Sequence, residues 1–181
     1  MALSATIFKI NLQVSDMDRN YYAEHLLTMA RHPSETDERM MVRLLAFALH
    51  ANEHLNFTKG LCVDDEPDLW QKNLTNEIEL WIDVGLPDER RVRKACNRAA
   101  QVFLYLYGGR GADIWWQRHA DKLQRFDNLY VIEFPEIASK ILTNFVQRNM
   151  QLQCTIQDGE IWLSGGDLSH SISPLVRKPL E

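Results

Sequence analysis

The sequence predicts an α/β protein built on a mixed central sheet flanked by helices. Stretches of alternating polarity near both ends predict an N-terminal and a C-terminal β-hairpin. Between them, segments with helical periodicity alternate with short apolar strands, which is the pattern of helices packed on a sheet. Because 181 residues fit one domain with a full core, we expect a single domain over residues 1–181.

The first elements are expected to be a hairpin and a long helix. Residues 5–14 alternate in polarity and predict a strand, whereas residues 21–31 fit a helix or a strand. Since only a short turn-forming segment separates the two stretches, we favour the second strand of a hairpin. Ser34 is the candidate N-cap of the next helix, which apolar residues at helical spacing extend to about His54.

Strands and helices alternate through the rest of the chain. Strands are predicted at residues 56–62, 77–85, 102–107 and 129–133, and helices at residues 87–99, 112–123 and after Pro135. Two further strands within residues 150–164 flank Asp158-Gly159, a strong signal for a hairpin turn. Residues 165–181 are rich in glycine, serine and proline, and we expect them to form a loose tail.

The composition excludes several classes of protein. No stretch approaches the roughly 18 consecutive apolar residues of a membrane span, and the N-terminus lacks an apolar signal region, so we expect a cytoplasmic protein without a membrane partner. Three cysteines without a C-x-x-C pair argue against a disulfide framework and a thiolate zinc site. The net charge of −5 argues against binding nucleic acid by overall electrostatics, but a local basic site remains compatible with it.

Acidic side chains gather towards the end of the predicted strand at residues 77–85. Asp83 shares one face of this strand with Glu77 and Glu79, and it lies at the strand end, where α/β folds place reactive groups. Asp68 precedes the same strand. Two carboxylates from neighbouring strand ends can hold Mg²⁺ or Mn²⁺, which would polarise a phosphodiester and activate a water. The alternative is that Asp68 is a solvated loop acid and Asp83 a strand-end cap.

Basic side chains form a stripe on the helix predicted next. On a helical wheel the stripe lies opposite the apolar face and consists of Arg90, Arg91, Lys94 and Arg98. A basic stripe after an acidic centre suits a phosphate backbone or the charge of its transition state. Arg90, Arg91 and Arg98 are therefore candidate substrate-binding residues, with a solvated helix surface as the alternative.

Several blocks of sequence, in order along the chain, resemble the bacterial YaeQ-like family. They are RHPSE at residues 31–35, ERMM at 38–41, DDEP at 64–67, LWI at 80–82, VGLPDERR at 84–91, IWW at 114–116 and TIQDG at 155–159. That family resembles the PD-(D/E)XK nuclease superfamily in fold, so the resemblance implies a restriction-endonuclease-like core. It also implies metal-ligand roles for Asp68 and Asp83, with Glu38, or else Glu35, as an additional helix acid.

The chain departs from the superfamily pattern at one position. The superfamily usually has a lysine two residues past the second acid, and this sequence has Gly85 there. The resemblance makes Lys94, on the next helix, the candidate replacement. It thus implies a Mg²⁺- or Mn²⁺-dependent nuclease with Glu38, Asp68, Asp83 and Lys94 as catalytic residues. The missing lysine keeps open an inactive nuclease-like fold that binds nucleic acid or a protein partner.

One further motif carries a possible metal chemistry. His50-Ala51-Asn52-Glu53-His54 matches the H-x-x-E-H signature of inverted zinc peptidases, in which both histidines reach one Zn²⁺ from one helix. The match lies at the end of its predicted helix, where histidines interact favourably with the helix dipole. We therefore expect helix-end histidines at these positions.

Overall fold

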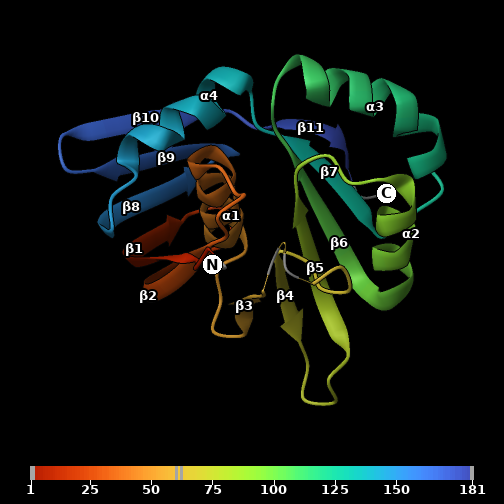
Figure 1. The fold of residues 1–181 in the computed structure, drawn as a ribbon, viewed down its shortest axis with the longest axis horizontal. Helices are drawn as coiled ribbons and strands as arrows, with labels where there is room; N and C mark the ends of the chain where they lie inside the picture. Colours follow the sequence, from red (N-terminus) through yellow and green to blue (C-terminus); the bar gives the residue numbers. More distant parts are fainter. Residues whose placement is uncertain (1–2, 60, 62, 180–181) are drawn as a thin grey trace. The chain divides into compact units, whose positions relative to one another are not determined.

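The computed structural model of the chain describes residues 3–59, 61 and 63–179. The chain divides into two compact units, unit 1 (Met1–Ala51 and Ile137–Pro174) and unit 2 (Asn52–Glu136 and Leu175–Glu181). Each unit has its own mixed sheet (Figure 1). The α/β class is confirmed, but the expectation of one central sheet is wrong.

Unit 1 contains a five-stranded sheet in the order β10-β9-β8-β1-β2. Its strands are β1 (Thr6–Asp16), β2 (Tyr21–Arg31), β8 (Asn149–Gln157), β9 (Glu160–Gly165) and β10 (Leu168–Ile172). Both predicted hairpins are confirmed, as β1–β2 and β8–β9. The hairpins join each other through parallel pairing of β1 with β8, and for this reason they form a separate sheet.

Helix α1 (Asp37–His50) begins and ends differently from the prediction. Its N-cap is Thr36, whose hydroxyl accepts a hydrogen bond from the Arg39 N–H, so the expectation for Ser34 is wrong. The Ser34 N–H instead donates to the His32 ring in a local turn. The helix ends at His50 because the next residues turn, with the Asn52 side chain accepting from the His54 N–H.

This helix end removes the geometric basis of the zinc-peptidase motif. His50 is the last residue of α1, whereas His54 lies beyond it in a turn and belongs to unit 2. The two histidines therefore do not face one metal ion from successive turns of one helix, as the motif requires.

The low pKa of His50 predicts that the stability of unit 1 depends on pH. Burial, together with the charge of Arg19, lowers the pKa of His50 from 6.5 to about 3. Between these values the unfolded chain binds a proton that the folded chain does not, so the free energy of unfolding falls as the pH drops below about 6.5. Between about pH 7 and about pH 4.5, we expect His50→Gln to reduce this fall in the free energy of unfolding by on the order of 2 kcal/mol.

Urea titrations at about pH 7 and about pH 4.5 measure this difference. The exposed His54 provides the control variant, His54→Gln, which should keep the natural pH dependence. An unchanged pH dependence in His50→Gln would show that His50 is not the responsible group.

Unit 2 contains a six-stranded sheet in the order β11-β7-β6-β5-β4-β3. Its strands are β3 (Leu55–Phe57), β4 (Leu69–Lys72), β5 (Ile78–Val84), β6 (Ala99–Leu106), β7 (Leu129–Glu133) and β11 (Leu175–Lys178). Strands β5, β6 and β7 are parallel, and helices α2 (Glu89–Arg98) and α3 (Arg110–Leu123) connect them. A short helix α4 (Glu136–Ile141) and a 3₁₀ turn η2 (Leu142–Phe145) follow β7 along the chain and, from Ile137 on, belong to unit 1.

Four short strands differ from the prediction. Strand β4 lies in a segment for which no element was predicted. The strand predicted at residues 56–62 covers Leu55–Phe57, and Gly60 and Cys62 lie outside the described residues. The expected loose tail contains β10 and β11. These segments are strands because neighbouring strands supply their hydrogen bonds, and local sequence carries little information about such partners.

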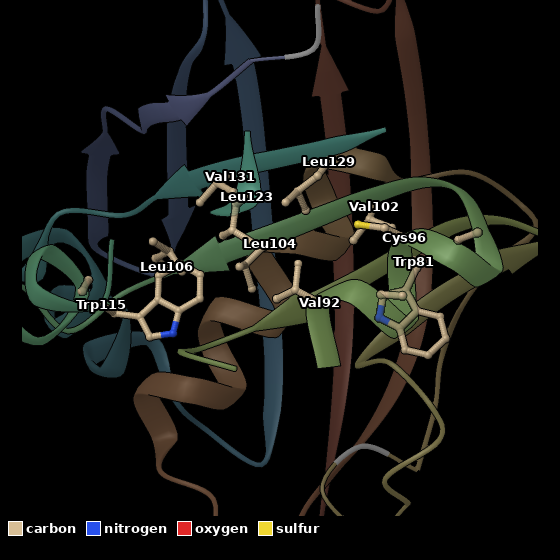
Figure 2. Packing of buried hydrophobic residues seen from close by; sticks show 13 residues of the cluster. Trp81, Val92, Cys96, Val102, Leu104, Leu106, Trp115, Leu123, Leu129 and Val131 are labelled. Atoms are coloured by element: carbon tan, nitrogen blue, oxygen red, sulfur yellow. The ribbon is translucent and has the colours of Figure 1, made fainter. Parts of the chain in front are cut away.

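A hydrophobic cluster fixes α2 and α3 on one face of the sheet in unit 2 (Figure 2). Trp81 of β5, Val92 of α2, Val102 and Leu104 of β6 and Trp115 of α3 belong to it. Burying each large apolar side chain contributes about 1.5–3 kcal/mol, so the cluster holds both helices firmly. Trp81 and Asp83 are two residues apart on β5, so Asp83 points to the face that α2 covers.

No helix in the described part of the chain is long and apolar enough to cross a bilayer.

Candidate functional site

Asp68 and Asp83 lie at the same edge of the sheet in unit 2. Antiparallel pairing of Leu69 with Ile82 places Asp68 opposite Asp83, just before β4 begins and as β5 ends. The Asp68 N–H donates to the Ile82 carbonyl at 3.0 Å. Both acids are buried, at 3% and 4% exposure, so Asp68 is not a solvated loop acid.

The carboxylate of Asp83 is held on both oxygens by two side chains. Arg91 donates to it in a bidentate arrangement, with Nε and Nη2 each 2.9 Å from a different oxygen. The Trp81 indole N–H donates to the same carboxylate at 3.0 Å. A bidentate guanidinium–carboxylate pair compensates charge and fixes orientation. Arg91, predicted to bind substrate, is thus the partner of a predicted metal ligand.

The carboxylate of Asp68 is anchored to the neighbouring strand. One oxygen accepts a hydrogen bond from the Val84 N–H at 2.8 Å. This bond satisfies a backbone donor at the end of β5, which is the role of a strand-end cap. The residue after Val84 is Gly85, whose φ of 111° is in the region that favours glycine. A lysine at this position would strain the backbone.

Helix α2 presents its basic residues away from the core, as the helical wheel predicted. Val92, Ala95 and Cys96 are its buried residues. Asp88 is the N-cap, and its carboxylate accepts from the Arg91 N–H at 2.8 Å. The first turn is further fixed by Trp115, whose indole N–H donates to the Pro87 carbonyl at 2.8 Å. The direction of the basic side chains is therefore set by packing on one side and by capping at the start.

The basic residues of α2 hold the acidic loop at residues 64–66. Arg91 donates to the carbonyl oxygens of Asp64 and Glu66 at 3.0 and 2.8 Å. Arg98 donates to the carbonyl of Asp65 at 2.9 Å. Lys94 forms an ion pair with the Asp65 carboxylate, and its hydrogen bond lowers the pKa of Asp65. Lys94, expected to replace the missing catalytic lysine, is thus paired with an exposed loop acid.

A groove of about 740 Å³ runs along α2. It is lined by five cationic and three other side chains: Arg90, Arg91, Arg93, Lys94 and Arg98, with Asp64, Asp88 and Asn97. The two acids leave an excess of positive charge along the groove. Arg93 was not among the predicted residues, although the run Glu89-Arg90-Arg91-Val92-Arg93-Lys94 places it in the same basic segment.

Glu38 lies in unit 1, on the first turn of α1. Its carboxylate accepts a hydrogen bond from the buried Ser139 hydroxyl at 2.7 Å. The other helix acid, Glu35, accepts hydrogen bonds from Arg39 and Arg43 and is buried. Each of these two carboxylates therefore has a partner inside its own unit.

The carboxylates are the right kind of ligand for Mg²⁺, but their present arrangement does not fit one. Both oxygens of Asp83 are engaged by Arg91 and Trp81, so a cation would have to displace the guanidinium. Within the described residues no group of three or more His, Cys, Asp or Glu side chains is placed to hold a metal ion.

Comparisons with known proteins identify the family. The family described as "YaeQ protein" matches residues 1–174. The chain belongs to the YaeQ family. It is 53% identical to the uncharacterized protein YaeQ of Escherichia coli (strain K12) over 164 residues, or 91% of each chain. The corresponding YaeQ protein of Salmonella typhi is 52% identical over the same share of each chain.

Crystal structures of YaeQ proteins agree with the fold of the described residues. The YaeQ protein of Xanthomonas axonopodis pv. citri has a TM-score of 0.94 at 51% identity, covering 97% of this chain and 99% of that one. The YaeQ protein of Pseudomonas syringae has a TM-score of 0.93 at 32% identity, with 97% coverage of each chain. The predicted YaeQ resemblance is thus confirmed, whereas the nuclease-like core stays a prediction.

Proposed function

We propose that this YaeQ family member binds the phosphate backbone of a nucleic acid through the groove along α2, without hydrolysing it. The observation that carries the proposal is the groove itself, in which five cationic side chains from one helix face a single open channel. Phosphate contacts from Arg and Lys supply affinity and position a protein on nucleic acid without reading its sequence. A local basic groove can supply this phosphate affinity even in a protein with a net charge of −5.

Arg90 and Arg93 are the most available phosphate ligands of this groove. Both side chains are exposed, and neither side chain makes a hydrogen bond or an ion pair to another described residue. A guanidinium presents two parallel donors to phosphate oxygens and stays charged at all physiological pH values. These two side chains would make the first contacts with a backbone entering the groove.

The acidic loop would compete with nucleic acid for the remaining cations. Its carbonyl and carboxylate oxygens already occupy Arg91, Lys94 and Arg98. Phosphate oxygens seek the same donors, so binding along the whole helix requires the loop to give up some of these bonds. Because the ion pair between Lys94 and Asp65 is exposed, its contribution to stability is small, so Lys94 can exchange Asp65 for a phosphate at low cost.

Asp65→Asn is therefore expected to tighten binding to a nucleic-acid probe two- to tenfold at low salt and to leave the fold intact. The substitution frees Lys94 and removes a negative charge from the groove. Fluorescence anisotropy with a labelled oligonucleotide measures the affinity. The exposed Asp127, which does not line the groove, gives the control Asp127→Asn. Equal affinities of both variants and the natural chain would show that the loop does not compete.

Metal-dependent phosphodiester hydrolysis is the second candidate function. One observation favours it, namely that Asp68 and Asp83 are buried next to each other at strand ends. Lys94 belongs to the same unit as these acids and would be a further member of the implied catalytic set, with Mg²⁺ or Mn²⁺ as the cofactor, whereas Glu38 belongs to unit 1. The obstacles are the Arg91 pair on Asp83 and the glycine conformation at Gly85.

Asp83→Asn separates the two candidates. If Asp83 is the structural partner of Arg91, the variant loses a charged hydrogen-bond pair and should be destabilised by about 1.5–3 kcal/mol. If Asp83 is also a metal ligand, the variant should in addition lose a Mg²⁺- or Mn²⁺-dependent cleavage of DNA or RNA that the natural chain shows. Urea denaturation measures the stability, and a cleavage assay measures the activity. Glu79→Gln, on the exposed part of β5, is the control.

A further inference from the structure

A second groove, of about 270 Å³, lies on the outward face of the sheet in unit 1. The residues that line it come from β1, β8 and β9 and the turn after β9: Asn11, Gln13, Gln151, Leu152, Gln153, Ser164, Gly165 and Gly166. Alternation along β1 turns Ile10, Leu12 and Val14 to the core and Asn11 and Gln13 outward. The polar side chains of the groove are therefore outward residues of three adjacent strands, whereas Leu152 is a core residue.

The strand register brings the polar side chains of this groove into two neighbouring rows. Gln13 pairs with Gln153, which pairs with Ser164, and Asn11 pairs with Gln151. Side chains opposite each other on one face of a sheet are about 4.5–5.5 Å apart at Cβ, so the amides lie within reach of one ligand. We call this set, Asn11, Gln13, Gln151, Gln153 and Ser164, the amide groove.

The amide groove has unused hydrogen-bonding capacity. The side-chain amides of Gln13, Gln151 and Gln153 make no hydrogen bond to another described residue, and each offers two donors and one acceptor. Asn11 donates from Nδ2 to Glu24 at 2.6 Å, which fixes the orientation of its amide. Its Oδ1 is buried and has no partner among the described residues.

The chemistry of the amide groove selects a neutral ligand rich in hydroxyl groups. None of the side chains that line it is charged, so it lacks the cations that phosphate binding requires. A hydroxyl both donates and accepts, as an amide side chain does, and one sugar ring presents several hydroxyls at once. Trp162 lies on the same face, two residues before Ser164, and is 40% exposed. Its ring offers a flat apolar surface beside the polar groove.

We propose that the amide groove binds a neutral saccharide unit. The amides of Gln13, Gln151 and Gln153 exchange hydrogen bonds with ring hydroxyls. Trp162 packs against the apolar face of the sugar. This site lies wholly within unit 1 and is independent of the nucleic-acid groove on α2, so either proposal can fail without the other.

NMR titration of the ¹⁵N-labelled full chain with glucose, galactose, N-acetylglucosamine, maltose and cellobiose tests the proposal. We expect saturable shifts of the side-chain amide signals of Gln13, Gln151 and Gln153 with at least one of these sugars. Gln13→Ala with Gln153→Ala should weaken that binding at least tenfold, and Trp162→Ala should also weaken it. Gln157→Ala, at an exposed position of β8 outside the groove, should leave binding unchanged.

Three results would overturn the proposal. One is the absence of saturable shifts at these amides with every sugar up to its solubility limit. Another is binding that the double glutamine variant retains, while its spectrum shows that it is folded. The third is saturable binding at these amides by adenosine or uridine and not by any sugar, which would make the groove a nucleobase site instead.

Discussion

Glu35→Gln is expected to destabilise unit 1 by about 3–5 kcal/mol, because it leaves a buried charge without its partner. The Glu35 carboxylate accepts from Arg43 Nε and Nη2, both at 2.7 Å, and from Arg39 Nη1 at 2.9 Å. Side chains of Glu35 and Arg43 are 2% and 4% exposed. A glutamine keeps the shape but turns an NH₂ donor towards guanidinium donors, so the positive charge of Arg43 remains buried and uncompensated.

Urea denaturation followed by circular dichroism measures this loss. Glu53 is exposed, and its side chain makes no hydrogen bond or ion pair to another described residue, so it provides the control Glu53→Gln, which should change stability by less than about 0.5 kcal/mol. The double variant Glu35→Leu with Arg43→Met should be more stable than Glu35→Gln alone, because it removes both charges. A loss below about 1 kcal/mol in Glu35→Gln would contradict the assignment of this pair as a structural anchor of α1.

Arg90→Ala with Arg93→Ala is expected to weaken nucleic-acid binding tenfold to a hundredfold at low salt. These two arginines are exposed in the α2 groove, and their loss removes two phosphate contacts without removing a bond that holds the fold. Fluorescence anisotropy with a DNA duplex and with a single-stranded RNA of equal length measures the effect on both kinds of backbone.

The matched control is Arg110→Ala with Arg118→Ala. These two arginines are also exposed, belong to α3 of the same unit and do not line the groove. Both double variants change the net charge of the protein by the same amount, so a difference in affinity between them reports where the lost charges lie. If both double variants lose affinity equally, the groove is not the binding site and only the overall charge matters.

Local patterns predicted most elements of this fold and little of how they join. The strand at residues 129–133 and the buried face of α2 follow from periodicity, and Asp158 and Gly159 adopt positive φ values of 52° and 76° in the predicted hairpin turn. The parallel pairing of β1 with β8 joins residues about 140 positions apart, and no local pattern encodes it. The two-sheet organisation depends on that single long-range pairing.

The candidate site was likewise predicted only in its local features. Strand-end reasoning predicted that Asp68 and Asp83 lie near each other, because both flank strands of one sheet. It did not predict that Arg91 binds Asp83 or that the loop at residues 64–66 covers α2, because side-chain partners depend on three-dimensional distance. Arg91 and Asp83, for which the sequence predicted substrate and metal binding, therefore bind each other in the structure.

The salt dependence of nucleic-acid affinity tests most directly whether the α2 groove binds a phosphate backbone. The logarithm of the association constant falls with the logarithm of salt concentration, with a slope of about 0.9 per phosphate contact on a duplex. We predict that Arg90→Ala with Arg93→Ala reduces this slope by about 2, while Arg110→Ala with Arg118→Ala leaves it unchanged. An unchanged slope in the groove variant, or the absence of salt-dependent binding in the natural chain, would contradict phosphate binding at α2.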